Sequence, residues 1–170
     1  MKYGILVGRF QPFHLGHLQA VKFALSKVEM LWIIIGSAQK NHEPRNPFTA
    51  GERLAMIKIA LDANKVDPKR WLAIPVNDVD VHSLWVNQID ILVPRYDVAF
   101  TNDPFSTTLF KEHGKKVVKV PMVKRKFLSG TEVRRRIANN ENWKELVPRQ
   151  VAEIIKEIDG IERIKLLQSK

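Results

Sequence analysis

Residues 8–17 read Gly8-Arg9-Phe10-Gln11-Pro12-Phe13-His14-Leu15-Gly16-His17 and follow directly on an apolar run from Tyr3 to Val7. A strand that leads through such a turn into a helix is typical of a phosphate-binding βα turn. His14 and His17 stand three residues apart at the opening of the helix, so both rings can reach one anionic group over its N-terminus. Gly16 lets a ligand approach the backbone closely. This stretch therefore predicts where the chemistry takes place.

Length and composition indicate one globular domain over residues 1–170. Of these residues, 45% are hydrophobic and 27% are charged, an ordinary globular composition. The chain has no cysteine, which excludes a disulfide framework and a thiolate metal site. Because residues 30–35 are too short an apolar run to span a bilayer and no signal segment precedes the first strand, we expect a cytoplasmic protein with no membrane partner. The net charge of +10 implies an anionic partner, either a nucleic acid or a small phosphorylated ligand.

Short apolar runs alternate with helical patterns along most of the chain. Strands are predicted at residues 3–7, 31–35, 71–76, 98–101 and 117–120. Helices are predicted at residues 18–28, 49–63, 83–92 and 104–113, and then, from about residue 129, at 129–139 and 148–159. The alternation predicts an α/β fold: a single Rossmann-like, doubly wound parallel sheet with a C-terminal helical segment. Such sheets bind ligands at the carboxyl ends of their strands, near the switch in strand order.

A second anion site is predicted at Ser129-Gly130-Thr131-Glu132-Val133-Arg134-Arg135-Arg136. Ser129 and Glu132 have the spacing of a capping box, which marks a helix N-terminus with free backbone N–H groups. Arg134, one turn into this helix, can present two parallel hydrogen bonds to phosphate oxygens. Against the single carboxylate of Glu132 stand six basic residues, namely Lys124, Arg125, Lys126, Arg134, Arg135 and Arg136.

These two segments resemble the signatures of the nucleotidyltransferase superfamily. His14-Leu15-Gly16-His17 resembles its H-x-G-H motif, and residues 129–134 resemble its I-S-x-T-x-x-R motif. Within the superfamily the chain is similar to archaeal-type nicotinamide-nucleotide adenylyltransferases. The similarity is carried by residues 8–14, by Gly36-Ser37-Ala38-Gln39, by Asn46-Pro47-Phe48-Thr49-Ala50-Gly51-Glu52-Arg53 and by residues 129–136.

The resemblance implies transfer of the adenylyl group of ATP to nicotinamide mononucleotide (NMN), giving NAD⁺ and pyrophosphate. It implies a homo-oligomer and Mg²⁺ held mainly through the ATP phosphates, with no metal ligand from the protein and no nucleic-acid partner. The implied catalytic residues are His14, His17 and Arg134. The implied ATP contacts are Gly8, Arg9, Phe10, Gly16, Ser129, Gly130, Thr131 and Arg135, and the implied NMN contacts are Arg45, Asp78 and Trp85. The chain departs from the family at Thr101-Asn102-Asp103-Pro104, where Ser-Gly-Asn-Pro is usual, which leaves the polar contact of that asparagine in question.

The chemistry of the residues agrees with this reaction. The acceptor phosphate is already ionised, and the motifs contain no Ser, Cys or Lys nucleophile paired with a base, so direct attack on the α-phosphorus is expected. Positioning can supply up to roughly 7 to 11 kcal/mol, and charge stabilisation on the leaving pyrophosphate adds to it. Trp85, by resemblance, stacks on the nicotinamide, and a cationic pyridinium over an indole face is a sound cation–π pair.

Each candidate residue also has a purely structural interpretation. Trp85 suits a core position, Asp78 a turn or cap, and Arg135 and Arg136 a solvated helix face. Phe10 and Phe13 are expected to anchor the turn in the core. A zinc site at the two histidines is disfavoured, because the other histidines lie in unrelated segments, at His42, His82 and His113.

Two other functions stay open from the sequence. The same reaction could use phosphopantetheine, glycerol phosphate or a flavin as acceptor, although Arg9 stands where those relatives commonly have Ser or Thr. A nucleic-acid-binding module would explain the charge, but interleaved exposed aromatics and a known RNA-binding motif are lacking. Neither a G-x-G-x-x-G nor a P-loop pattern is present.

Overall fold

The computed structural model describes residues 2–121 and 128–169. Five parallel strands form one sheet in the order β3-β2-β1-β4-β5. The strands are β1 (Tyr3–Gly8), β2 (Met30–Ile35), β3 (Trp71–Pro75), β4 (Val98–Phe100) and β5 (Lys116–Val118). The strand order reverses between β1 and β4, so the crevice at the carboxyl ends of these two strands is the expected ligand site. The predicted doubly wound fold is confirmed, with strand ends shifted by one or two residues.

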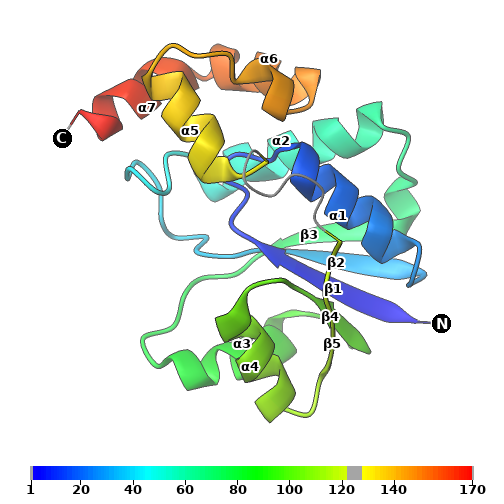
Figure 1. Cartoon of the computed structure of the whole chain (residues 1–170). Helices are drawn as coiled ribbons and strands as arrows, with labels where there is room; N and C mark the ends of the chain where they lie inside the picture. The colour runs from blue at the N-terminus through cyan, green and yellow to red at the C-terminus, as the bar shows by residue number, and fades with distance from the viewer. Residues whose placement is uncertain (1, 122–127, 170) are drawn as a thin grey trace.

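Helices cover both faces of the sheet (Figure 1). Helices α3 and α4 lie on one face, and α1, α2 and the C-terminal helices lie on the other. The α-helices are α1 (Leu15–Leu25), α2 (Ala50–Ala63), α3 (Trp85–Leu92), α4 (Pro104–Glu112), α5 (Gly130–Ala138), α6 (Arg149–Glu157) and α7 (Gly160–Gln168). Within residues 2–121 and 128–169, no helix combines the length and apolar character that a membrane crossing requires.

The strands alternate their side chains between two hydrophobic clusters. Ile5 and Ile34 pack with α3 and α4 on one face, while Leu6, Ile33 and other β-strand residues pack on the opposite face. The second cluster is continuous with the C-terminal helices, because it includes buried residues of α5, α6 and α7, namely Val133, Ile137, Val151, Ala152, Ile155 and Ile164. The C-terminal helical segment therefore shares one core with the sheet.

Two helices differ from the sequence prediction. α1 begins at Leu15 rather than at residue 18, because His14 already acts as its N-cap. α7 was not predicted as a separate helix. It follows α6 across Asp159, whose φ of 54° turns the chain sharply, so the helical pattern continues in a new direction that periodicity alone does not indicate.

Candidate functional site

His14 and His17 form a reciprocal cap at the start of α1. The backbone N–H of His17 donates to Nδ1 of His14, and the backbone N–H of His14 donates to Nδ1 of His17, both at 3.3 Å. The two rings stack with their centroids 3.6 Å apart. The prediction that both histidines lie side by side at a helix N-terminus is confirmed.

This cap fixes where each imidazole carries its proton. A neutral imidazole has one donor and one acceptor nitrogen, and in both rings Nδ1 is the acceptor, so both protons are on Nε2. Burial lowers the pKa of His14 to about 4. Burial, and then the adjacent His14, lower the pKa of His17 well below its ordinary value. At neutral pH the pair therefore offers two uncharged Nε2–H donors at the end of β1.

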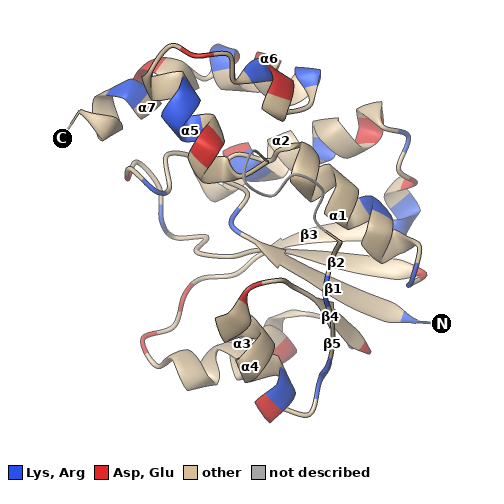
Figure 2. Cartoon of the chain, viewed as in Figure 1, with Lys and Arg blue, Asp and Glu red and all other residues tan. Residues whose placement is uncertain are grey.

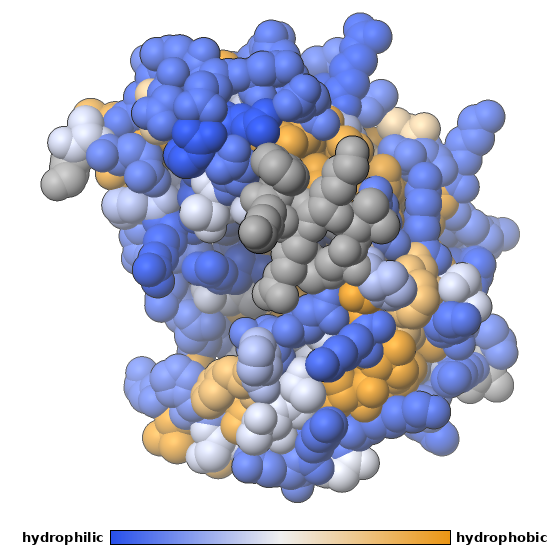
Figure 3. Space-filling model, in the orientation of Figure 1, coloured by the Kyte–Doolittle hydropathy of each residue, from blue (hydrophilic) through white to orange (hydrophobic). Residues whose placement is uncertain are grey.

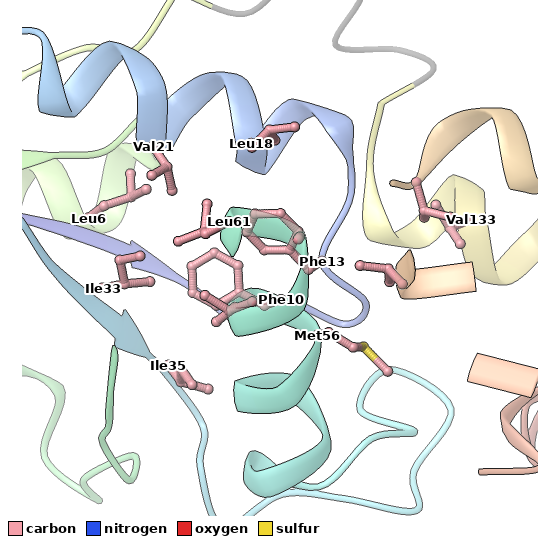
Figure 4. Close-up of a cluster of buried hydrophobic side chains, with 14 of the residues drawn as sticks. Leu6, Phe10, Phe13, Leu18, Val21, Ile33, Ile35, Met56, Leu61 and Val133 are labelled. Atoms are coloured by element: carbon pink, nitrogen blue, oxygen red, sulfur yellow. The ribbon is translucent and has the colours of Figure 1, made fainter. Parts of the chain in front are cut away.

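The turn itself is anchored by its phenylalanines, as expected. Phe10 and Phe13 are almost fully buried and point into the core cluster shown in Figure 4. Phe10 has a φ of 52°, a conformation that costs on the order of 1–3 kcal/mol for a residue with a side chain. Gly8 makes room for it, since a Cβ there would lie 2.8 Å from the Phe10 ring. A Cβ at Gly16 would lie 3.0 Å from the His14 ring, so this glycine makes room for His14.

The second motif meets this turn through Arg134. Its Nη1 donates to the carbonyl oxygen of Gln11 at 2.7 Å, and Arg134 is only 6% exposed. Gly130 permits the approach, because a Cβ there would lie 2.8 Å from the same carbonyl oxygen. Nε of Arg134 is buried with no hydrogen-bond partner among the described residues. Burial first, and then the charges of Arg9 and Arg45, lower the pKa of Arg134 to about 10.

The capping box predicted at α5 is only half formed. Ser129 accepts from the backbone N–H of Glu132 at 3.1 Å, but the Glu132 carboxylate is held by Arg135 and Arg136 instead of returning to the cap. These bonds lower the pKa of Glu132 to about 2. Figure 2 shows acidic residues beside the basic ones on the C-terminal helices. Glu141 and Glu145 also pair with these arginines, so Glu132 is not the single carboxylate beside Arg135 and Arg136. Lys124, Arg125 and Lys126 lie outside the described residues.

Three cavities meet around the turn, and Arg9 lines all of them. The turn cavity, of about 370 Å³, lies between the turn and the start of α5 and is lined among others by Gln11, His14, Gly16, His17, Ser129, Gly130, Thr131 and Arg134. The tryptophan cavity, of about 980 Å³, is lined among others by Gly8, Gly36, Ser37, Arg45, Asp78 and Trp85. The arginine cavity, of about 760 Å³, is lined among others by Arg45, Thr131, Arg134, Arg135 and Lys165.

Trp85 and Asp78 both face the tryptophan cavity, yet each also has structural contacts. The Trp85 ring is half-buried and packs edge-on against Phe110 at 5.6 Å. Asp78 accepts from Ser37 Oγ at 2.9 Å and pairs with Lys40 Nζ at 3.2 Å. The structural and the functional interpretations of these two residues are thus compatible.

Three residues near the site were not predicted to have a role. Gln11 bonds the backbone of Phe48 through both ends of its amide, at 2.8 and 2.9 Å. Arg53 is fully buried beneath the turn. Asn102 bonds the backbone of Val120 on both sides, at 2.8 and 3.0 Å, while Asp103, at the position usually occupied by asparagine, caps α4. The polar residue types inside the motif blocks were the available signal, but their partners are distant in sequence.

Comparisons with known proteins identify the class. A model of the cytidylyltransferase-like family matches residues 5–136, so the chain belongs to this family of nucleotidyltransferases. A relative from Archaeoglobus fulgidus is 50% identical over 163 residues, covering 94% of this chain and 93% of its own. A relative from Thermococcus kodakarensis is 46% identical over 167 residues, covering 98% and 89%. Both are named nicotinamide-nucleotide adenylyltransferase. Within the family, the chain belongs to this group of enzymes.

A solved structure supports the fold. The bifunctional NMN adenylyltransferase/ADP ribose pyrophosphatase from Francisella tularensis, complexed with AMP and a manganese ion, superimposes with a TM-score of 0.82 at 23% identity. The match covers 98% of this chain and 51% of that chain, so this chain spans about half of that protein's length.

The buried, neutral state of His14 predicts a pH dependence of stability. Because its folded-state pKa of about 4 lies below its ordinary value of 6.5, the unfolded chain takes up a proton first as the pH falls. Stability should therefore decrease between pH 6.5 and 4. His14→Asn keeps a capping oxygen and removes this titration. We expect urea unfolding of the wild type to lose free energy more steeply than His14→Asn across this window. Equal slopes in the two proteins would show that His14 is not buried in its neutral form.

Proposed function

We propose that the chain transfers the adenylyl group of ATP to NMN, giving NAD⁺ and pyrophosphate. The observation that carries the proposal is the position of Arg9, which lines all three cavities around the β1 turn. ATP would occupy the turn cavity, with its terminal phosphates toward the arginine cavity, and NMN would occupy the tryptophan cavity. The phosphates of both substrates then approach each other beside one guanidinium.

The transfer is proposed to be a single direct displacement. An oxygen of the NMN 5′-phosphate forms a bond to the α-phosphorus of ATP as the bond between this phosphorus and the bridging oxygen to the β-phosphorus breaks. The electron pair leaves on pyrophosphate, and no proton has to be removed from the attacking phosphate. Positioning of the two substrates supplies most of the acceleration in such a reaction.

The donors for the leaving charge come from both motifs. His14 and His17 are proposed to donate their Nε2–H groups to the triphosphate of ATP, and Arg134 to bond the β- and γ-phosphates. The unpartnered, buried Nε of Arg134 supports this role, because such a donor is costly unless a ligand satisfies it. The backbone of residues 129–131 adds the free N–H groups of a helix start. Gly8, Phe10 and Gly16 contribute through backbone and shape, and Arg135 through its place on the arginine cavity wall.

A divalent ion, proposed to be Mg²⁺, would accompany ATP. Among residues 2–121 and 128–169, no group of three or more His, Asp or Glu side chains is placed to hold a metal ion. This donor set suits an ion held by the phosphates themselves. When bound there, the ion neutralises charge on the triphosphate.

The tryptophan cavity has the chemistry that NMN needs. The indole of Trp85 offers a π face to the cationic pyridinium, and Arg45 offers a cation to the phosphate. Asp78, already bonded to Ser37 and Lys40, offers a carboxylate oxygen to a ribose hydroxyl or the amide. An acceptor without a cationic ring, such as phosphopantetheine, would leave the π face of Trp85 without a cation.

The proposals for binding partners and for oligomeric state rest on the charges and apolar side chains at the surface of the chain. Arg135 and Arg136 are neutralised by Glu132, Glu141 and Glu145, which weakens the nucleic-acid hypothesis. Orange patches in the lower half of Figure 3 mark apolar side chains on the part of the molecule that carries β4, β5, α3 and α4. Ile91 on α3 is 81% exposed. Such exposed apolar side chains support the proposal of a homo-oligomer.

The acceptor is tested with a substrate panel. The protein is incubated with ATP, Mg²⁺ and a set of phosphorylated acceptors, and pyrophosphate release is measured. We expect the fastest release with NMN, because only this acceptor brings a cationic ring to Trp85 and a phosphate to Arg9 and Arg45. Equal or faster release with phosphopantetheine would refute the proposed acceptor while keeping the reaction type.

The role of Trp85 is tested by two substitutions. Trp85→Ala should raise the KM for NMN by about tenfold, equivalent to about 1.4 kcal/mol, with little change in the KM for ATP. Trp85→Phe should recover part of this loss, because it keeps an aromatic face.

Trp143 serves as a matched control, since it is a buried tryptophan that lines none of the three cavities. Trp143→Phe should lower the melting temperature and leave both KM values unchanged. A Trp85→Ala protein that loses about 3 to 5 kcal/mol of stability but keeps the wild-type ratio of KM values would place Trp85 in the core alone.

A further inference from the structure

Arg53 is a fully buried arginine whose hydrogen bonds all go to backbone carbonyls. It lies on α2, one turn from the N-cap, with 0% of its surface exposed. Its Nη1 donates to the oxygens of Arg9 and Gly36 at 2.9 and 2.8 Å. Its Nη2 donates to those of Ser37 and Ala38 at 3.1 and 3.4 Å, and its Nε to that of Thr49 at 3.2 Å. These bonds use the full donor capacity of a guanidinium.

Such an arginine is expensive for stability alone. In the described part of the chain no carboxylate lies within ion-pair distance of Arg53. Burial, and then the charge of Arg9, lower its pKa to about 10, while the more distant charges of Asp78 and Glu52 act in the opposite direction. Burying a charge without an opposite charge in contact costs free energy, and an apolar residue would fill the same space more cheaply. The position of the carbonyls that accept hydrogen bonds from Arg53 gives a reason for an arginine at this place.

Four of the five carbonyls that Arg53 binds, all except that of Thr49, belong to the turns after β1 and β2, which line the tryptophan cavity. Arg9 follows β1, and Gly36 and Ser37 follow β2; all three line this cavity, whereas Arg53 lines none of the three cavities. Ser37 has a φ of 48° and donates its Oγ to Asp78. The bonds from Arg53 therefore hold Arg9 and the Ser37–Asp78 pair at a fixed separation.

We infer that Arg53 is a positioning residue for the acceptor nucleotide, acting through the backbones of Arg9, Gly36 and Ser37 without touching the substrate. This inference rests on the proposed function. It predicts that weakening the Arg53 bonds damages acceptor binding more than ATP binding. Arg9 also lines the two cavities assigned to ATP, but Gly36 and Ser37 line the tryptophan cavity alone, and the histidines and the α5 N-terminus do not bond to Arg53.

Arg70 provides a matched control at the opposite end of the sheet. It too binds backbone carbonyls, donating to Leu25, Val28 and Glu29 at 2.8, 2.7 and 3.1 Å. These carbonyls lie at the end of α1 and in the turn that leads to β2, and Arg70 lines none of the three cavities. Arg70→Lys therefore reports the cost of losing carbonyl bonds away from the site.

The experiment compares Arg53→Lys with Arg70→Lys. Lysine keeps the charge but has three donors in place of a planar fork. Both variants should have a lower melting temperature. Arg53→Lys should raise the KM for NMN by about tenfold and that for ATP by less than about threefold, whereas Arg70→Lys should change neither by more than about twofold. These KM values are insensitive to the fraction of folded protein, because only folded molecules bind substrate.

Two results would overturn the inference. One is an Arg53→Lys protein with a lower melting temperature and unchanged KM values, like the control. The other is an equal rise in both KM values, which would mean a general loosening of the site. The wild-type assay separates this inference from the proposed function: wild type that makes no NAD⁺ refutes the function, whereas active wild type beside an unaffected Arg53→Lys refutes the inference alone.

If Arg53→Lys does not fold, the wild-type protein gives the answer by NMR. The Nη–H resonances of Arg53 should shift when NMN is added, because their acceptors include Arg9, Gly36 and Ser37, which line the proposed NMN cavity, while the Nη–H resonances of Arg70 should stay in place. Arg53 Nη–H resonances that do not move at saturating NMN would overturn the inference.

Discussion

The hydrogen bond from Arg134 Nη1 to the carbonyl oxygen of Gln11 joins the two halves of the site. The two residues are 123 positions apart in the sequence, and the bond is 2.7 Å long and buried. It sets the start of α5 against the turn after β1, at a distance that only a glycine at position 130 permits. The turn cavity, the placement of the paired histidines beside Ser129 and Thr131, and the direction of the remaining Arg134 donors all depend on this contact.

The arginines of the site lie near other cations, whereas the arginines on the surfaces of the C-terminal helices pair with carboxylates. Arg135, Arg136 and Arg149 pair with neighbouring glutamates, as cations on helices usually do. The charges that act most on Arg134 are those of Arg9 and Arg45, two further cations. Like charges gathered around one crevice destabilise each other until an anion binds, so the arrangement favours a polyphosphate. The histidines add donors to this crevice without adding charge, because burial keeps them neutral.

Local sequence patterns predicted those features of the fold that depend on interactions between residues close in the sequence. The strands followed from short apolar runs, and the motif blocks predicted that residues 8–17 and 129–136 act together. The start of α1 at Leu15 required knowing that a histidine can cap a helix. The capping-box contact of Glu132 was mispredicted because Arg135 and Arg136, on the same helix, bind its carboxylate. The further partners of these arginines, Glu141 and Glu145, lie beyond that helix. The sequence does not indicate the partners of Arg53, since its bonds reach carbonyls up to 44 positions away.

The claim that the two motifs carry out one direct displacement is tested by stereochemistry at the α-phosphorus. ATP made chiral there by sulfur substitution is converted to the dinucleotide, and the configuration of the product is determined. A single attack by the acceptor phosphate inverts this centre, and inversion is the result that the proposed direct displacement predicts. Retention of configuration would require an adenylylated enzyme and would contradict the account.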